Sequence, residues 1–216
     1  MPKKFAVVLS GNGVFDGAEI HEATMTLYAI AKQGAEYEIF APDIAQHHVI
    51  NHITGKEMPE KRNVLIESSR IARGKISPLK EFDADKFDAI VFPGGFGVAK
   101  NLSDFAFKGA SCTVISDVEN AILSMYKSKK PIGGLCISPV IIAKTLQGVT
   151  VTIGNDDATN SEIDKMGSKN KKTSHGDVTF DQDYKVYTTP CYMLDATIVN
   201  IADGAMNIIK AMLEDI

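Results

Sequence analysis

The sequence predicts an open α/β fold, in which helices cover both faces of a mostly parallel sheet. Short apolar runs alternate with stretches of helical periodicity along the whole chain. Such runs are typical of parallel strands, and the helices between them supply the crossovers that parallel strands need. The chain has 216 residues, 44% of them hydrophobic, with no internal repeat and no linker. We therefore expect residues 1–216 to form a single domain with one sizeable core.

Each predicted strand is an apolar run that stops at proline, glycine or a polar turn. In chain order the runs are residues 5–9, 37–41, 89–92, 132–135 and 149–153, followed by a hairpin of 178–180 and 185–187. The run at 37–41 stops at Pro42, and the run at 89–92 leads into the glycine-rich turn Pro93–Gly97. The run at 132–135 leads directly into Cys136.

The predicted helices lie between these runs and place apolar residues at helical spacing. In chain order they are residues 17–32, 62–73, 114–127, 138–146, 160–166 and 196–213. Gly34 and Gly74 follow the first two and are expected to end them. Segment 43–80 has no obvious place in the sheet, and we expect it to shape a subunit interface or a pocket lid.

Composition excludes several classes of protein. A net charge of -4 and a pI near 5.7 give no basic surface for nucleic acid or an anionic membrane. The apolar run Phe5–Leu9 is shorter than the roughly 7–15 residues of a signal sequence, and no run approaches the roughly 18 that a membrane span needs. We therefore expect a cytoplasmic protein without nucleic-acid or membrane partners.

The cysteines and histidines do not predict a metal site. The three cysteines are far apart and form no CxxC pair, which argues against a disulfide framework or a zinc knuckle. His47, His48 and His52 lie close together in the sequence but without convergent Asp, Glu or Cys. We expect no metal and no cofactor.

Cys136 is the main candidate for a catalytic residue. Gly134 lies two residues before it and Ser138 two after, as the steric crowding of a nucleophile elbow requires. Pro139 suits the first turn of the helix that follows. Backbone N–H groups at that helix end favour thiolate and are expected to lower the thiol pKa.

Two other segments carry residues that suit the same chemistry. The turn after residue 92 contains Gly94 and Gly95, whose N–H groups are candidates for an oxyanion hole together with that of Ile137. Glu19 and Glu22 are three apart and share a helix face. Acidic residues in a first helical turn often serve only as caps, so catalysis by either depends on proximity to the cysteine.

These segments resemble the ThiJ/PfpI branch of the class I glutamine amidotransferase-like superfamily, and most of all its ElbB group. The resemblance covers nearly the whole chain. It rests on VVLSGNGVFDGAEIHEA (7–23), FAPD (40–43), VINHITGKEM (49–58), RNVLIESSRIARGKI (62–76), FPGGFGVAKNLSDFA (92–106), GLCISP (134–139), TIGND (152–156) and YTTPCYM (187–193).

The resemblance implies a flavodoxin-like α/β/α sandwich and a homodimer. It also implies that Cys136 is the elbow nucleophile and that Glu22, with Glu19 as the fallback, hydrogen-bonds it. The oxyanion donors would be Gly94 or Gly95 together with Ile137. Where peptidase and amidase members have histidine after the cysteine, this chain has Ile137, and its late His175 is expected to be solvated.

A Cys–Glu pair without histidine suits glyoxalase chemistry better than amide hydrolysis. The thiolate would add to a small carbonyl substrate such as glyoxal, and the carboxyl would move a proton to give a 2-hydroxy acid. One alternative is a redox sensor that is oxidised at Cys136 and acts through partners. An amidase or protease is a third.

Three further residues are candidates for the pocket. Asn101 and Asp156 are expected at its rim. Cys191 follows Pro190 at a predicted strand end, where it either fills the core or lies near Cys136.

Overall fold

The computed structural model describes residues 2–216, and its centre is a seven-stranded sheet in the order β10-β11-β7-β6-β1-β2-β5. The strands are β1 (Lys4–Val8), β2 (Glu36–Ala41), β5 (Ser77–Pro78), β6 (Ala89–Phe92), β7 (Ile132–Leu135), β10 (Thr179–Asp181) and β11 (Val186–Thr189). Every pairing is parallel except that of β10 with β11. The predicted mostly parallel, doubly wound sheet is confirmed.

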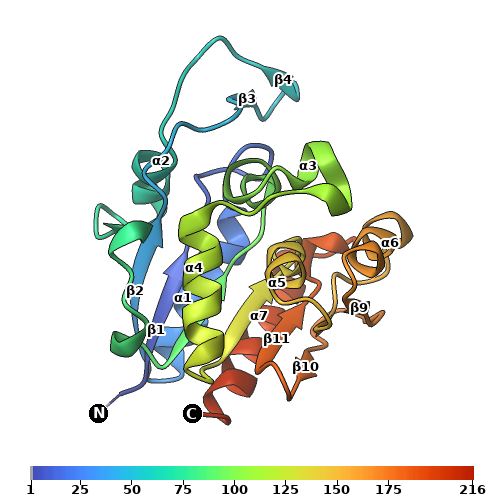
Figure 1. Ribbon diagram of the computed structural model, residues 1–216. Helices are drawn as coiled ribbons and strands as arrows, with labels where there is room; N and C mark the ends of the chain where they lie inside the picture. Colours follow the sequence, from blue (N-terminus) through green and yellow to red (C-terminus); the bar gives the residue numbers. More distant parts are fainter. Residues whose placement is uncertain (1) are drawn as a thin grey trace.

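Helices cover both faces of this sheet (Figure 1). They are α1 (Ile20–Lys32), α2 (Val64–Ile71), α3 (Phe105–Lys108), α4 (Ser116–Lys127), α5 (Pro139–Thr145), α6 (Asp157–Lys165) and α7 (Ile198–Leu213). Figure 1 shows α4 and α5 in front of the sheet and α1 and α7 behind it. Each face has its own apolar core, because parallel strands carry buried side chains on both sides.

The N-terminal ends of α1 and α7 are set by side chains that cap these helices. The Glu19 side chain accepts a hydrogen bond from the Glu22 N–H and caps α1. Thr197 and Asn200 form a capping box on α7. Because Glu19 is the cap, α1 begins at Ile20, not at Gly17 as the periodicity predicts. None of the helices between residues 2 and 216 has the length and apolar content that crossing a membrane requires.

Two short segments differ from the predicted strands. Residues 149–153 contribute only β8 (Thr150–Val151), which pairs with β9 (Lys169–Asn170) outside the main sheet. Segment 43–80, which had no predicted place in the sheet, supplies β5 at its edge beside β2. It also contains the hairpin β3 (Ile50–Asn51) and β4 (Lys56–Glu57), which stands apart from the layers in Figure 1.

Other elements carry no periodic signal in the sequence. They include one turn of π-helix, η3 (Val98–Leu102), and four 3-10 turns at Leu79–Glu81, Ala84–Lys86, Gly109–Ser111 and Cys191–Met193. The predicted hairpin of residues 178–187 is confirmed as β10 and β11. His175 is exposed, as predicted.

The two glycines of β7 allow helices to approach the sheet from both sides. A Cβ on Gly133 would lie 2.7 Å from the sulfur of Met212 in α7. A Cβ on Gly134 would lie 2.8 Å from Cδ1 of Ile142 in α5. Gly134 therefore fixes how closely α5 follows the turn at Cys136.

We expect Gly134→Ala to lower the free energy of unfolding by about 1–3 kcal/mol, because the added methyl group overpacks the contact with Ile142. Ile142→Val removes the colliding Cδ1 and should cost about 0.5–1.5 kcal/mol alone. The double variant should lose less than the sum of the two single losses. Chemical denaturation of all four proteins measures this coupling, and strictly additive costs would contradict the assigned contact.

Candidate active site

The candidate site lies at the carboxyl ends of four neighbouring strands, β1, β6, β7 and β11. In the sheet register, Leu135 is opposite Thr189, and Gly134 is opposite Phe92. The chain leaves β1 and β11 toward the helices α1 and α7, and it leaves β6 and β7 toward α4 and α5. Such a divergence of crossovers opens a crevice at the strand ends, where ligands of doubly wound sheets bind.

Cys136 occupies a strained turn between β7 and α5. Its φ is 60°, in the left-handed region that non-glycine residues rarely adopt. The turn is held by hydrogen bonds from the Cys136 N–H to the Thr189 carbonyl, at 3.0 Å, and from the Ser138 hydroxyl to the Pro93 carbonyl, at 2.8 Å. This is the geometry expected of a nucleophile elbow.

Glu22 lies beneath the cysteine and is fully buried. One carboxyl oxygen accepts a hydrogen bond from the Gly94 N–H and the other from the Tyr192 N–H, both at 3.1 Å. The carboxyl also lies against the Cys136 thiol, close enough for each group to shift the pKa of the other. A single side chain on α1 thus connects the elbow with the loops that follow β6 and β11.

Glu19 lies one turn earlier and has a structural contact instead. One of its carboxyl oxygens accepts the Glu22 N–H at 2.7 Å, and its own N–H donates to the Gly94 carbonyl at 2.9 Å. The structure therefore places Glu22, and not the fallback Glu19, against the Cys136 thiol.

Burial governs the protonation of the pair. It raises the pKa of Glu22 from 4.5 to about 8, and the nearby charge of Glu19 adds to this rise. Burial, followed by the negative charge of Glu22, raises the pKa of the Cys136 thiol. The sequence-based expectation of a lowered thiol pKa is not met, because desolvation outweighs the donors around the sulfur. Both groups are mainly protonated at neutral pH, and Glu22 ionises first.

The glycine turn after β6 is packed tightly against this pair. A Cβ on Gly94 would lie 2.6 Å from a Glu22 carboxyl oxygen and 3.0 Å from the Cys136 sulfur. The Gly94 N–H already donates a hydrogen bond to the Glu22 carboxyl, whereas the Gly95 N–H faces the Cys136 sulfur. No hydrogen bond within residues 2–216 engages the Ile137 N–H. Of the predicted oxyanion donors, Gly94 thus donates to Glu22, and Gly95 and Ile137 remain the candidates.

The turn at residues 190–193 adds site residues that the sequence analysis missed. Tyr192 presents its N–H to Glu22 and its ring to the cavity beside Cys136. Its hydroxyl lies 2.8 Å from Nδ1 of His21, the exposed residue before Glu22. Cys191 is buried, with φ of 43°, and its sulfur lies against Gly204 of α7. The motif YTTPCYM at a strand end was the available signal for Tyr192.

Asn101 and Asp156, the predicted rim residues, do not line the cavity. Asn101 is buried in η3, where its amide donates to the carbonyls of Ser10 and Asp16, both at 2.9 Å, and accepts from the His47 N–H. It therefore holds the loop after β1 in place. Asp156 caps α6 by accepting the Thr159 N–H at 2.8 Å, and only Thr159 reaches the cavity.

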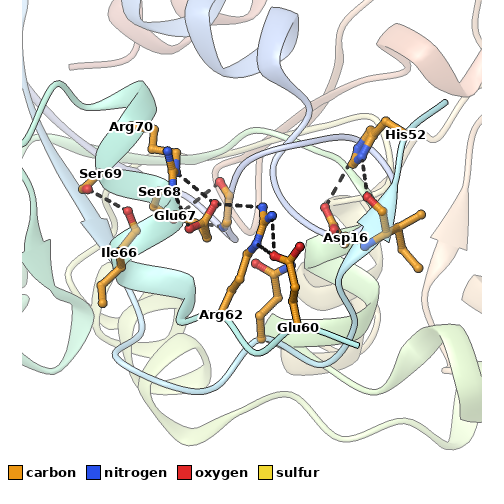
Figure 2. A network of polar contacts seen from close by, with 12 residues as sticks. Asp16, His52, Glu60, Arg62, Ile66, Glu67, Ser68, Ser69 and Arg70 are labelled. Atoms are coloured by element: carbon orange, nitrogen blue, oxygen red, sulfur yellow. Dashed lines mark hydrogen bonds and ion pairs between the residues drawn. The ribbon is translucent and has the colours of Figure 1, made fainter. Parts of the chain in front are cut away.

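Segment 43–80 supports the loop after β1 and is part of neither the elbow nor the cavity lining. Asp16 accepts the Ile50 N–H at 2.6 Å and lies 3.9 Å from Nε2 of His52. The same histidine nitrogen accepts the Phe15 N–H at 3.2 Å, and the two rings are in tilted contact with centroids 4.9 Å apart. Figure 2 shows Asp16 and His52 facing each other at one end of a polar network.

The remainder of that network holds segment 43–80 against the loop after β1. Figure 2 shows Arg62 between the carboxylates of Glu60 and Glu67, with Arg70 also paired to Glu67. The neighbouring Ser68 of α2 accepts the N–H of Gly11 at 2.9 Å, in the loop after β1. Because Glu67 is buried, its pairs with Arg62 and Arg70 are better shielded from solvent than ordinary surface ion pairs.

A cavity of about 280 Å³ opens above Cys136. Its walls come from the loop after β1, the glycine turn, α3, the elbow, α6 and the 190–193 turn. The lining residues are Val14, Gly95, Phe96, Ala99, Phe105, Ala106, Cys136, Ile137, Thr159, Tyr192 and Met193. Within residues 2–216, no cluster of His, Cys, Asp and Glu side chains is arranged to hold a metal ion.

An elbow cysteine paired with a buried carboxyl, at the carboxyl ends of a flavodoxin-like sheet, defines the class of protein. The comparisons with known proteins agree. The rat ES1 protein homolog is 44% identical over 98% of this chain and 83% of the relative. The human glutamine amidotransferase-like class 1 domain-containing protein 3 is 44% identical over 98% of this chain and 82% of the relative.

A crystal structure gives the same result. The isoprenoid biosynthesis protein with amidotransferase-like domain from Ehrlichia chaffeensis has a TM-score of 0.92 and 33% identity, covering 99% of this chain and 100% of that one. No family model matches the sequence. The chain belongs to the ElbB group of the ThiJ/PfpI, class I glutamine amidotransferase-like superfamily.

The comparisons also correct one expectation. The rat and human relatives are both named as mitochondrial proteins. This finding overturns the prediction of a cytoplasmic location, which rested on a lack of hydrophobic targeting signals.

The raised pKa of Glu22 predicts how stability depends on pH. Between pH 4.5 and about 8, the folded protein keeps a proton on Glu22 that the unfolded chain has lost. The free energy of unfolding should therefore fall by about 1.4 kcal/mol for each pH unit as pH rises through this window. Glu22→Gln should remove this contribution, although it leaves one buried N–H without an acceptor. Urea denaturation from pH 5 to 8 measures the difference in slope.

Glu36→Gln, which alters an exposed carboxylate on β2, is the control and should keep the wild-type slope. Equal slopes for wild type and Glu22→Gln would show that Glu22 is ionised in the folded protein and that its pKa is not raised.

Proposed function

We propose that the protein is a cofactor-independent, glyoxalase-like enzyme that converts small 2-oxoaldehydes to 2-hydroxy acids. The observation that supports this most strongly is the buried contact between the Cys136 thiol and the Glu22 carboxyl, whose pKa is raised by burial to about 8. A carboxyl with a pKa near neutrality serves as both acceptor and donor of protons under physiological conditions.

The proposed reaction begins with addition of the sulfur to the aldehyde carbon. The Glu22 carboxylate takes the thiol proton as the S–C bond forms and then gives it to the aldehyde oxygen, which yields a hemithioacetal and returns Glu22 to its ionised form. The Gly95 and Ile137 N–H groups would stabilise the negative oxygen before it is protonated.

The second stage moves hydrogen between the two carbons. Glu22 removes the proton from the carbon bonded to sulfur, giving an enediol, and a proton returns to the neighbouring carbon. The product is a thioester of the 2-hydroxy acid. Water hydrolyses it, regenerating the Cys136 thiol, so that the sum is oxoaldehyde plus water to hydroxy acid. The oxidation and reduction are both internal to the substrate.

The alternatives receive less support from the site. A redox sensor needs a thiolate, and the Cys136 thiol has a raised pKa that keeps it protonated. An amidase acting on glutamine needs partners for a charged ammonium and carboxylate, and the residues that line the cavity within the described chain carry no charged side chain. Histidine is also missing after the cysteine, where Ile137 stands.

The direct test is turnover of glyoxal, methylglyoxal and glutamine by the wild type and Cys136→Ser, with hydroxy acid and ammonia as the products measured. We expect hydroxy acid from the wild type, a loss of at least about a hundredfold in Cys136→Ser and in Glu22→Gln, and no ammonia. Cys112→Ser is the matched control, because Cys112 is a buried cysteine in the core of the other face. Equal rates in wild type and Cys136→Ser would overturn the mechanism.

The pH dependence of the reaction is a separate expectation. Only the ionised form of Glu22 accepts the thiol proton, so kcat/KM should rise about tenfold per pH unit below pH 8 and level off above it. Initial rates from pH 6 to 9, corrected by the Cys136→Ser background, give the profile. A flat profile would exclude Glu22 as the base.

A further inference from the structure

The cavity above Cys136 is larger than a small dialdehyde requires. Its volume is about 280 Å³, close to the lower end of the roughly 300–1,000 Å³ that hold drug-sized ligands. Glyoxal occupies about two water volumes, ~60 Å³. A substrate that fits the cavity therefore carries a substantial group beyond the reacting carbonyls.

The lining of the cavity is apolar on all sides of the elbow. Val14, Phe96, Phe105, Ile137 and Met193 contribute side chains from different segments of the chain. A small polar substrate gains little from these walls, whereas each buried methylene group of a longer one gains about 0.8 kcal/mol.

The aromatic ring of Phe96 points to the same conclusion. Phe96 lines the cavity from within the glycine turn, yet about half of its surface (49%) is exposed. An exposed aromatic side chain at the edge of an apolar cavity is typical of a ligand contact. A bound apolar group would cover this ring.

Charge excludes several other substrates. In the described part of the chain, the polar side chains on the lining are those of Cys136, Thr159 and Tyr192, none of them charged at neutral pH. The Lys100 ammonium lies over the Phe96 ring, 5.1 Å from its centroid, and donates to the Phe15 carbonyl at 2.9 Å, so it is not part of the lining. A phosphate, carboxylate or ammonium group in the cavity would lack a charged partner among the lining side chains, which costs several kcal/mol.

We infer that the cavity selects uncharged 2-oxoaldehydes that carry an apolar chain or ring, in preference to glyoxal and methylglyoxal. This inference rests on the proposed function for its reacting groups. The aldehyde carbon lies against the Cys136 sulfur, its oxygen faces the N–H groups of Gly95 and Ile137, and the apolar group extends between Phe96 and Met193.

The first experiment measures kcat/KM for glyoxal, methylglyoxal, propylglyoxal and phenylglyoxal. We expect a rise of about fourfold for each added methylene that the cavity buries, with phenylglyoxal far above glyoxal. A series that is flat, or that falls with size, would overturn the inference while leaving the proposed function in place.

Two variants of one helix test which wall makes the selection. Ala106 of α3 lines the cavity, and Ala106→Leu narrows it. This change should lower the ratio of phenylglyoxal to glyoxal turnover by about tenfold, because the ring no longer fits. Phe107→Leu is the matched control, since the Phe107 ring contacts His47 in a tilted arrangement, with centroids 4.5 Å apart, and does not line the cavity. Its ratio should stay at the wild-type value.

A binding measurement separates this inference from the proposed function. Butanal, hexanal and benzaldehyde form hemithioacetals but cannot isomerise, because they lack the second carbonyl. Each is used to protect Cys136 from iodoacetamide, with labelling of Cys136 and Cys112 followed by peptide mass spectrometry.

Protection of Cys136 alone, with hexanal and benzaldehyde stronger than butanal, supports the apolar cavity even if no oxoaldehyde is turned over. If this protection is seen and no oxoaldehyde is turned over, the glyoxalase proposal fails and the inferred selectivity of the cavity stands. Protection that is independent of the apolar group, or equal at Cys112, overturns the inferred selectivity whatever the turnover.

Discussion

The buried carboxyl of Glu22 is the constraint around which the site is organised. It accepts hydrogen bonds from the Gly94 and Tyr192 N–H groups and contacts the Cys136 thiol. Because no water reaches it, these three partners must all be in place for the carboxyl to be satisfied. Helix α1, the glycine turn, the elbow and the turn after β11 are thereby held in one arrangement, and each loop restricts the others.

The loop after β1 and segment 43–80, which do not contact Glu22, are fixed by a second set of buried polar contacts. Asn101 in the π-turn joins the loop after β1 to residue 47, and Asp16 joins the same loop to the hairpin of segment 43–80. The wall of the cavity that contains Val14 therefore depends on residues far from the elbow. A site built from loops is rigid here because its polar backbone groups are paired with buried side chains.

The sheet and its covering helices were predictable because hydrophobic periodicity reports burial directly. Cys136 was predictable from its neighbours, since an elbow demands small residues at fixed spacing, and Glu22 followed from the resemblance. The roles of Asn101 and Tyr192 could not be predicted, because these roles depend on which loops meet in space. The thiol pKa was expected in the wrong direction, since burial by surrounding loops leaves no local pattern in the sequence.

The left-handed backbone of Cys136 has an evolutionary implication. A non-glycine residue at φ of 60° costs about 1–2 kcal/mol, and glycine would adopt the same turn without strain. Selection for stability alone would therefore replace this cysteine with glycine, and the cavity would lose its thiol. The fold retains a residue that weakens it, next to a carboxyl whose burial weakens it further. That combination indicates a part of the molecule maintained by its chemistry and not by its folding.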